Sequence, residues 1–322
     1  MEFSDPMKKI SILGFIATSL LWWGCTEKMP LPPEPSGEIP PESTYTFIST
    51  WGENLSGTLM DLEYGADGYL YVLDSAGIHK FFGNGTEVAV WPYHGTAIDF
   101  GSDHTLWIAA MEGIYHLTLD GTPLDTLSFV SFPELSIAGL VEGENQDLFL
   151  TLPDADLVLQ VQDTLVDTLS TFGSGILYVD EPRGLAFQGG WLYVAVPGHN
   201  WVEVWDPYAS SLQSVLHLGG LNPNGDTSQG MFRRPLDVAV DENGFIYVAD
   251  SGNARVQVFR PDGSVLTVVD LEASTGIPEA PIRLTVSLTG KYLYVLTDQN
   301  RILKFERVEK PPPPPDTGGG GG

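Results

Sequence analysis

Residues 232–263 read FRRPLDVAVDENGFIYVADSGNARVQVFRPDG, and this stretch determines the fold expected for the whole chain. Its apolar runs are separated by Asp, Asn and Gly, which tolerate the backbone angles of tight turns. We predict an inner strand at Leu236–Asp241, a second at Phe245–Asp250, a third at Arg255–Arg260 and an outer one at Val265–Asp270. Four consecutive short strands of this kind predict one small antiparallel sheet.

An apolar–aromatic–apolar triplet in the second strand of this unit recurs six times along the chain. The aromatic residues lie between 36 and 54 positions apart, and a period of about 40–50 residues is typical of β-propeller blades. We therefore predict an all-β fold, a six-bladed β-propeller of four-stranded antiparallel blades. The triplets are Leu70–Val72, Leu106–Ile108, Leu148–Leu150, Leu192–Val194, Ile246–Val248 and Leu293–Val295.

The two ends of the repeat region predict how the ring closes. The sixth unit lacks a fourth strand, because Arg301–Val308 runs directly into a proline-rich tail. A spare strand, Tyr45–Thr50, precedes the first inner strand at Leu59–Tyr64. We predict that this N-terminal strand completes blade six and closes the ring, which removes exposed sheet edges.

Residues 232–263 resemble an NHL repeat, and Glu181–Pro207 is similar to a second, weaker copy. The matching residues are Pro235, Asp241, Gly244, Asp250, Asn253, Arg255 and Phe259. The resemblance implies that Asp250, Asn253 and Arg255 brace one another between blades and are structural. NHL rings serve as extracellular sensor domains, as protein- or RNA-binding modules and, in one branch, as a peptide lyase, so the resemblance does not select a function.

Composition excludes several classes of protein. The chain has 322 residues with 42 acidic and 15 basic side chains, and its formal net charge of -27 argues against nucleic acid as a partner. A single cysteine excludes a disulfide framework, a CxxC redox site and a cysteine zinc cluster. Acidic residues are unevenly distributed, since residues 29–182 contain 24 of them and one basic residue, Lys80.

Residues 1–24 resemble a bacterial lipoprotein signal peptide. Lys8 and Lys9 precede an apolar run, Ile10–Trp23, which ends at Gly24 and Cys25. The resemblance implies lipidation at Cys25 and a lipid-anchored location in the cell envelope, at the outer membrane or cell surface where there are two membranes. The alternative is a plain secretory signal followed by a buried cysteine.

The remaining boundaries follow from local composition. Residues 1–6 are interpreted as a mis-start or a scar, because Met7 begins a normal signal by itself. Residues 25–44 are rich in Pro and Glu and predict an extended tether, residues 45–310 form the propeller, and the Pro/Gly tail at 311–322 is expected to be disordered.

Catalytic motifs are not recognisable, and no catalytic residue is predicted. His79, His104, His116 and His217 are expected on turns or outer strands far from the axis. Only His94 and His199 are expected in loops at the face where propellers usually bind ligands, and two histidines without a third ligand make a poor zinc site.

Charged residues on the inner strands are the main exception. Alignment of the blades places Asp61, Asp237 and Arg283 at equivalent positions, which predicts an axial ion-pair cluster that closes the channel. Glu63 and Asp99 occupy equivalent positions in adjacent blades. The alternative interpretation is a calcium site with Asp61, Glu63 and Asp99 as oxygen ligands, and otherwise no cofactor or metal is expected.

The leading functional hypothesis is a surface-anchored, non-catalytic scaffold, not an enzyme. It would bind a protein, peptide or glycan through the loop face, because aromatic and arginine side chains are common interface anchors. The alternative hypothesis is a metal-dependent lactonase- or lyase-like enzyme with its site at the channel mouth. The binding-face candidates are Arg183, His199, Asn200, Trp201, Arg233 and Arg234.

Overall fold

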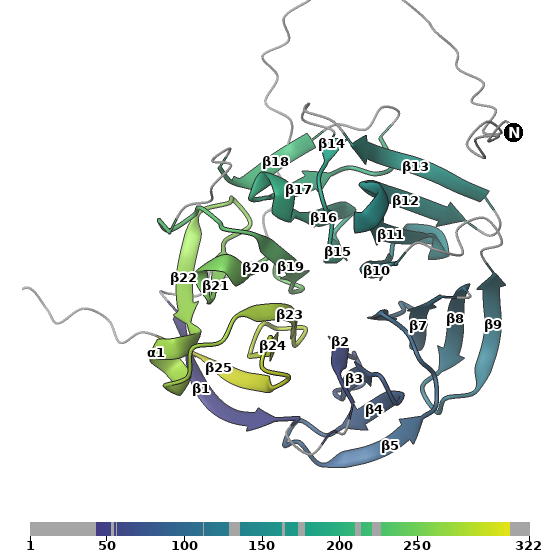
Figure 1. The fold of residues 1–322 in the computed structure, drawn as a ribbon, viewed down its shortest axis with the longest axis horizontal. Coiled ribbons are helices and arrows are strands. Elements are labelled where there is room, and N and C mark those ends of the chain that lie inside the picture. The colour runs from purple at the N-terminus through teal and green to yellow at the C-terminus, as the bar shows by residue number, and fades with distance from the viewer. Residues whose placement is uncertain are drawn as a thin grey trace, which may run out of the picture. The chain divides into compact units, whose positions relative to one another are not determined.

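The computed structural model of the protein describes residues 43–52, 55, 57–111, 113–128, 136–162, 165–172, 178–209, 214–220 and 227–309. Cys25, the signal region, most of the expected tether and the tail at 311–322 lie outside these residues. The described residues form six small sheets arranged in a ring around one axis (Figure 1). No described helix is both long enough and apolar enough to cross a membrane.

Blades one to three each contain four antiparallel strands, which follow one another from the axis outward. Blade one contains β2 (Leu59–Tyr64), β3 (Leu70–Asp74), β4 (Ile78–Phe81) and β5 (Glu87–Trp91). Blade two contains β6 (Ala97–Phe100), β7 (Thr105–Ala110), β8 (Gly113–Thr118) and β9 (Pro123–Ser128). Blade three contains β10 (Gly139–Glu142), β11 (Leu148–Leu152), β12 (Leu157–Gln162) and β13 (Leu165–Phe172), and a short fifth strand, β14 (Tyr178–Val179), pairs parallel to β13.

Blades four to six repeat the same order. Blade four contains β15 (Leu185–Gln188), β16 (Trp191–Val196), β17 (Trp201–Trp205) and β18 (Ser214–Gly219). Blade five contains β19 (Pro235–Val240), β20 (Ile246–Asp250), β21 (Arg255–Phe259) and β22 (Val265–Asp270). Blade six contains β23 (Pro281–Val286), β24 (Tyr292–Thr297), β25 (Ile302–Glu309) and β1 (Ser43–Trp51).

The predicted ring closure is confirmed. Strand β1 pairs antiparallel with β25, with Phe47 opposite Phe305, and so the start of the described chain completes the last blade. The hydroxyl of Tyr45 on β1 also shares a hydrogen bond of 2.9 Å with the hydroxyl of Tyr247 in blade five. The closing strand is therefore fixed to two blades.

The apolar–aromatic triplets lie on the second strand of each blade, as predicted. Every residue of β3, β7, β11 and β20 is buried, because these strands have partners on both edges and adjacent blades on both faces. Tyr71, Phe149, Tyr247 and Tyr294 are among the largest fully buried side chains. Burial of each such apolar side chain contributes about 1.5–3 kcal/mol, so the repeated triplet stabilises the contacts between blades.

Helical structure is limited to short turns. One helix, α1 (Leu271–Thr275), follows the outer strand of blade five, and the side chain of Asp270 caps it by accepting from the N–H of Ala273. Single 3-10 turns occupy Glu144–Gln146 after β10, Pro153–Ala155 after β11, Pro197–His199 after β16 and Ser251–Asn253 after β20. Helix α1 is not among the elements that the repeat pattern predicts.

Candidate functional site at the ring axis

Three aspartates on inner strands connect neighbouring blades. Asp61 Oδ2 accepts a hydrogen bond from the backbone N–H of Ile98 in blade two, 3.0 Å away. Asp99 and Asp237 bind the inner strands of blades three and six in the same way, each at 2.8 Å. These carboxyl groups satisfy backbone donors at the blade junctions, so they stabilise the ring as well as facing its axis.

Arg283 closes the axis at the end where the inner strands begin. One guanidinium nitrogen donates to the carbonyl oxygen of Ala138 in blade three at 3.0 Å, and another donates to that of Ile282 in its own blade at 2.9 Å. Its Nε lies 3.5 Å from Asp61 Oδ1. Because blades three and six are opposite each other in a ring of six, this side chain spans the channel.

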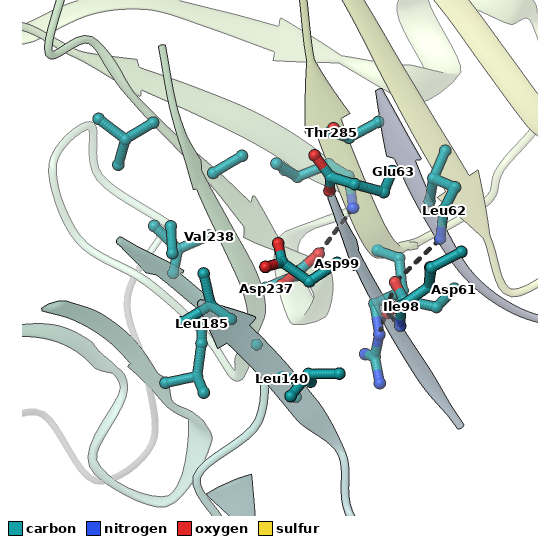
Figure 2. Close-up of a pocket in the computed structure, with 18 of the residues that line it drawn as sticks. Asp61, Leu62, Glu63, Ile98, Asp99, Leu140, Leu185, Asp237, Val238 and Thr285 are labelled. Atoms are coloured by element: carbon teal, nitrogen blue, oxygen red, sulfur yellow. Dashed lines mark hydrogen bonds and ion pairs between the residues drawn. The ribbon is translucent and has the colours of Figure 1, made fainter. Parts of the chain in front are cut away.

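The inner strands enclose a cavity of about 120 Å³ next to Arg283. Figure 2 shows Glu63, Asp99 and Asp237 on different inner strands around this cavity. The charged or hydroxyl-bearing side chains that line it are Asp61, Glu63, Asp99, Asp237, Arg283 and Thr285. Four carboxyl groups therefore surround one small space that contains a single cationic side chain.

The environment favours the protonated forms of these carboxyl groups. Burial raises the pKa of Asp61 to about 6, and that of Asp99 and of Asp237 to about 7. Burial and the neighbouring Asp99 raise the pKa of Glu63 well above its usual range. Near neutral pH the Glu63 carboxyl is thus expected to hold a proton while Asp99 exchanges one.

A wider vestibule of about 420 Å³ adjoins the cavity at the opposite end, where the inner strands finish. Glu63 and Asp99 line both spaces. The vestibule wall also includes Tyr64, Phe100, Ser102, His104, Glu142, Phe187, Gln188, Asp241 and Glu242. No lysine or arginine is among its lining residues, so the opening is strongly acidic.

The calcium hypothesis is not supported by the arrangement of these groups. Among the described residues, no three Asp, Glu, His or Cys side chains are placed to hold a metal ion. Both oxygens of Asp61 are also used within the fold, where they accept the N–H groups of Leu62 and Ile98. Together with Glu63 and Asp99 it does not form a calcium-binding set, and no chemical step is assigned to a metal.

The binding-face candidates lie at the other end of the ring, before or beside the starts of the inner strands. Arg234 is exposed and forms a 3.4 Å ion pair with Glu181. Asn200 and Trp201 are only 5% exposed, and the Asn200 side chain accepts from the N–H of Arg234 at 2.7 Å. Both are packed inside the blade, so this part of the predicted face is wrong.

The remaining candidates of that face stay predictions, and Arg233 is exposed. The N–H of Arg233 donates to Asp250 Oδ1 at 2.8 Å. His199 lies 4.5 Å from the Trp201 ring, between ring centroids. Burial and the proximity of Arg283 lower the pKa of Arg183, and Arg183 is not among the residues that line the vestibule.

The position of His104 differs from the sequence prediction. The sequence places it far from the axis, but it lines the vestibule with Glu63 and Asp99. The turn between the first two strands of blade two brings it there. His79 and His217 do pair with acidic residues within their own blades, Glu87 and Glu203 respectively.

The residues assigned to a structural brace are found together in blade five. Arg255 Nε donates to Asp250 Oδ2 at 2.7 Å, and Asn253 Nδ2 donates to the same oxygen at 2.9 Å. Arg255 also donates to the carbonyl oxygens of Thr227 and Ser228 in the segment that enters the blade. These contacts join residues of blade five and the segment that enters it, whereas the resemblance implies bracing between blades.

Comparison with known proteins agrees with this architecture. The NHL repeat family model matches residues 232–259. A streptogramin B lyase structure superposes with a TM-score of 0.58 at 13% identity, covering 83% of this chain and 98% of the lyase. A catalytically inactive virginiamycin B lyase from Staphylococcus aureus with quinupristin gives 0.57 at 11% identity, covering 82% and 99%.

A gluconolactonase from Xanthomonas campestris gives a TM-score of 0.61 at 15% identity, covering 87% of this chain and 99% of that chain. No curated protein matches the sequence. These structural neighbours are enzymes, which contradicts the hypothesis of a non-catalytic scaffold and the prediction that the protein is not an enzyme. Since identities of 11–15% establish the fold alone, an activity has to be inferred from the axial site itself. The chain is a six-bladed β-propeller that carries an NHL repeat at residues 232–259.

Proposed function

We propose that the protein is an enzyme that hydrolyses small neutral lactones or esters in the axial cavity, by general acid–base catalysis. The observation that carries the proposal is the pair Glu63 and Asp99. They lie at equivalent positions on adjacent inner strands, and both line the cavity and its open vestibule. Burial raises the pKa of both carboxyl groups, so that one can hold a proton while the other accepts one, which is the usual arrangement for an acid and a base.

Each carboxyl group has a defined role in this proposal. Asp99, with a pKa of about 7, accepts a proton from water as the water oxygen bonds to the carbonyl carbon. Protonated Glu63 donates its proton to the leaving oxygen as the carbon–oxygen bond breaks. The product is a hydroxy acid, or an acid and an alcohol, and the proton on Asp99 returns to Glu63 through water.

Size and charge of the site support this class of substrate. A vestibule of about 420 Å³ is in the range of pockets that bind small molecules. Its acidic lining repels anions and therefore favours a neutral reactant. The carboxylate product carries a negative charge, so the same repulsion aids its release.

The experiment is a pH-stat assay of purified protein against a panel of γ- and δ-lactones and simple aryl esters. We expect turnover by the wild type, and a loss of about 100-fold or more in kcat for Glu63→Gln and for Asp99→Asn. Asp262→Asn, on an exposed outer turn of blade five, is the matched control and should retain full activity. Wild-type protein inactive on every substrate, or full activity of Glu63→Gln, would refute the proposal.

A parallel assay of protein treated with EDTA, followed by elemental analysis, addresses the role of a metal. Since no described side chains form a metal-binding group, we expect kcat to survive chelation. Loss of activity that added Ca²⁺ restores would instead assign the chemistry to a metal enzyme.

We also propose that the enzyme acts at the cell envelope, held there by lipid on Cys25. The support is the charged, apolar and small-residue pattern before this cysteine. Residues 25–42, the part of the predicted tether that precedes β1, would keep the ring away from the bilayer.

A further inference from the structure

Four of the six blades use the same turn between the inner and second strands. In each, the N–H of the fourth residue donates to the carbonyl oxygen of the first, at N···O distances between 2.6 and 3.1 Å. The fourth residue has a positive φ in every case. These residues are Gly68 in blade one, His104 in blade two, Gly244 in blade five and Gly290 in blade six.

Among these four turns, blade two alone has a residue other than glycine at the fourth position, and in blade three the corresponding residue, Gln146, also has a positive φ of 64°. The φ angle of His104 is 63°, against 84°, 76° and 68° for the three glycines. Glycine adopts this left-handed conformation without steric cost, whereas a side chain with a Cβ is strained there. A histidine at this position is therefore less favourable for the turn than glycine is.

The turn is held rigidly from the neighbouring blade. Glu142, on the inner strand of blade three, accepts from the N–H of Ser102 at 3.2 Å and from its hydroxyl at 2.7 Å. The indole N–H of Trp107 donates to the same carboxylate at 2.9 Å. Strained conformations persist when such surrounding contacts fix them, and they occur often at functional sites.

The side chain of His104 is directed to the proposed site. It is exposed, and its ring lies 6.0 Å from the ring of Phe100, between centroids. Both residues line the vestibule with Glu63 and Asp99. No other histidine is among the lining residues of the vestibule.

We propose that His104 is a substrate-contacting residue of the axial enzyme, which hydrogen-bonds a carbonyl or hydroxyl group of the bound substrate at the mouth of the cavity. This inference rests on the proposed function, because it assigns a role within the same site. An imidazole both donates and accepts hydrogen bonds, which suits a neutral lactone or ester that bears oxygen atoms. The strained backbone is then the cost of placing this ring.

The decisive variant is His104→Gly, which gives blade two the residue that the other three turns have. Removal of the strain should leave Tm unchanged or raise it by about 1–3 °C. Removal of the contact should raise KM about tenfold or more, with a smaller change in kcat. In His104→Asn the new residue also tolerates this conformation, but the imidazole is lost, so this variant should also raise KM. His94→Asn, an exposed histidine that binds the Ser75 carbonyl outside the vestibule, is the control.

The outcomes separate a functional histidine from a structural one. Raised KM with unchanged or higher Tm supports the inference. Unchanged kinetics of His104→Gly overturn it, and a parallel fall of activity and Tm overturns it in favour of a structural role.

A second measurement separates failure of this inference from failure of the proposed function. The imidazole signals of His104 are followed by NMR while δ-valerolactam, an unreactive lactam isostere, is added. If the wild type hydrolyses nothing on the panel, the proposed function fails. In that case the inference that His104 contacts a ligand is supported only if the lactam shifts the NMR signals of His104 and not those of His94. If the His104 signals do not shift, the inference is overturned.

Discussion

The ion pair between Glu203 and His217 in blade four provides a stability prediction with a matched control in the chain itself. Glu203 is fully buried, and its Oε1 is bonded to His217 Nε2 at 2.7 Å. The other carboxylate oxygen has no hydrogen-bond partner among the described residues. His217 is therefore the side chain that keeps this buried charge tolerable, and it also stacks on Trp201 at 4.8 Å between ring centroids.

Replacement of His217 by valine would leave a buried carboxylate without its partner. Breaking a buried ion pair in this way costs about 3–5 kcal/mol. For a ring of this size, 1 kcal/mol corresponds to about 2–4 °C in Tm, so we expect a fall of about 6–20 °C. In blade five the equivalent positions are Gln257 and Val268, which pair in the same register.

The double variant Glu203→Gln/His217→Val copies the blade-five pair and removes the buried charge with its partner. Replacement of both members of a buried pair is often neutral or stabilising, so the double variant should recover most of the lost stability. Urea unfolding of wild type, both single variants and the double variant measures the coupling. Either of two results would refute this reasoning: a loss of unfolding free energy below about 1 kcal/mol in His217→Val, or a double variant as unstable as His217→Val. Each would show that His217 does not compensate the buried charge of Glu203.

The pH dependence of this pair has a definite sign. The hydrogen bond to Glu203 raises the pKa of His217. The stabilisation by the ion pair is fully present below the pKa of His217 in the unfolded chain, about 6.5. It is lost as pH rises through the higher pKa of His217 in the folded protein. The difference in unfolding free energy between wild type and His217→Val should therefore be larger at pH 6 than at pH 9.

Three further predictions concern the axis and the anchor. Burial raises the pKa of Asp99 to about 7, and a base acts when it is deprotonated, so kcat/KM should fall about tenfold per pH unit below pH 7. A kcat/KM that does not change between pH 5 and 7 would contradict the role of Asp99 as the base. The folded-state pKa values of Asp61, about 6, and of Asp237, about 7, exceed the ordinary value of 3.8. These groups therefore stabilise the ring at low pH, and that stabilisation is lost as pH rises from 4 to 7. The urea midpoint of the wild type should be higher at pH 5 than at pH 8, and this difference should be smaller in Asp237→Asn. Finally, Cys25→Ser should release the protein from membranes into the soluble fraction, whereas unchanged partitioning with membranes would argue against lipidation.

The sequence predicts the ring well because its signals are local and repeated. The triplet around Tyr247 reappears at Tyr71 and Tyr294 with blade-like spacing, and each copy needs burial on two faces. Closure by Tyr45–Thr50 follows from simple counting of strands. Blade count and closure depend on patterns within about 50 residues of sequence, which is the length of one blade.

The site is less predictable because it depends on which backbone groups reach which side chains. The aligned positions of Asp61 and Asp99 give no sign that their oxygens accept N–H groups of the next blade. Trp201 is the first residue of β17, a strand whose residues are all buried, although the sequence predicts a loop-face position for it. The sequence does not place His104 at the vestibule, because its position follows from a turn equivalent to that of Gly244, and this equivalence is clear only in the structure.

The blade junctions explain why Glu63 is available for chemistry while its neighbours are partly committed. Asp61, Asp99 and Asp237 each accept a backbone N–H from the following blade. At the junction of blades six and one, the acceptor for the N–H of Tyr64 is the Thr285 hydroxyl, at 3.1 Å. The hydroxyl takes the connecting role that a carboxyl group has elsewhere, and the Glu63 side chain in turn hydrogen-bonds to Thr285. Because the amide of Gln can also hydrogen-bond to this hydroxyl, Glu63→Gln should lose activity with little loss of stability, whereas Asp99 serves the junction directly as well as the proposed reaction.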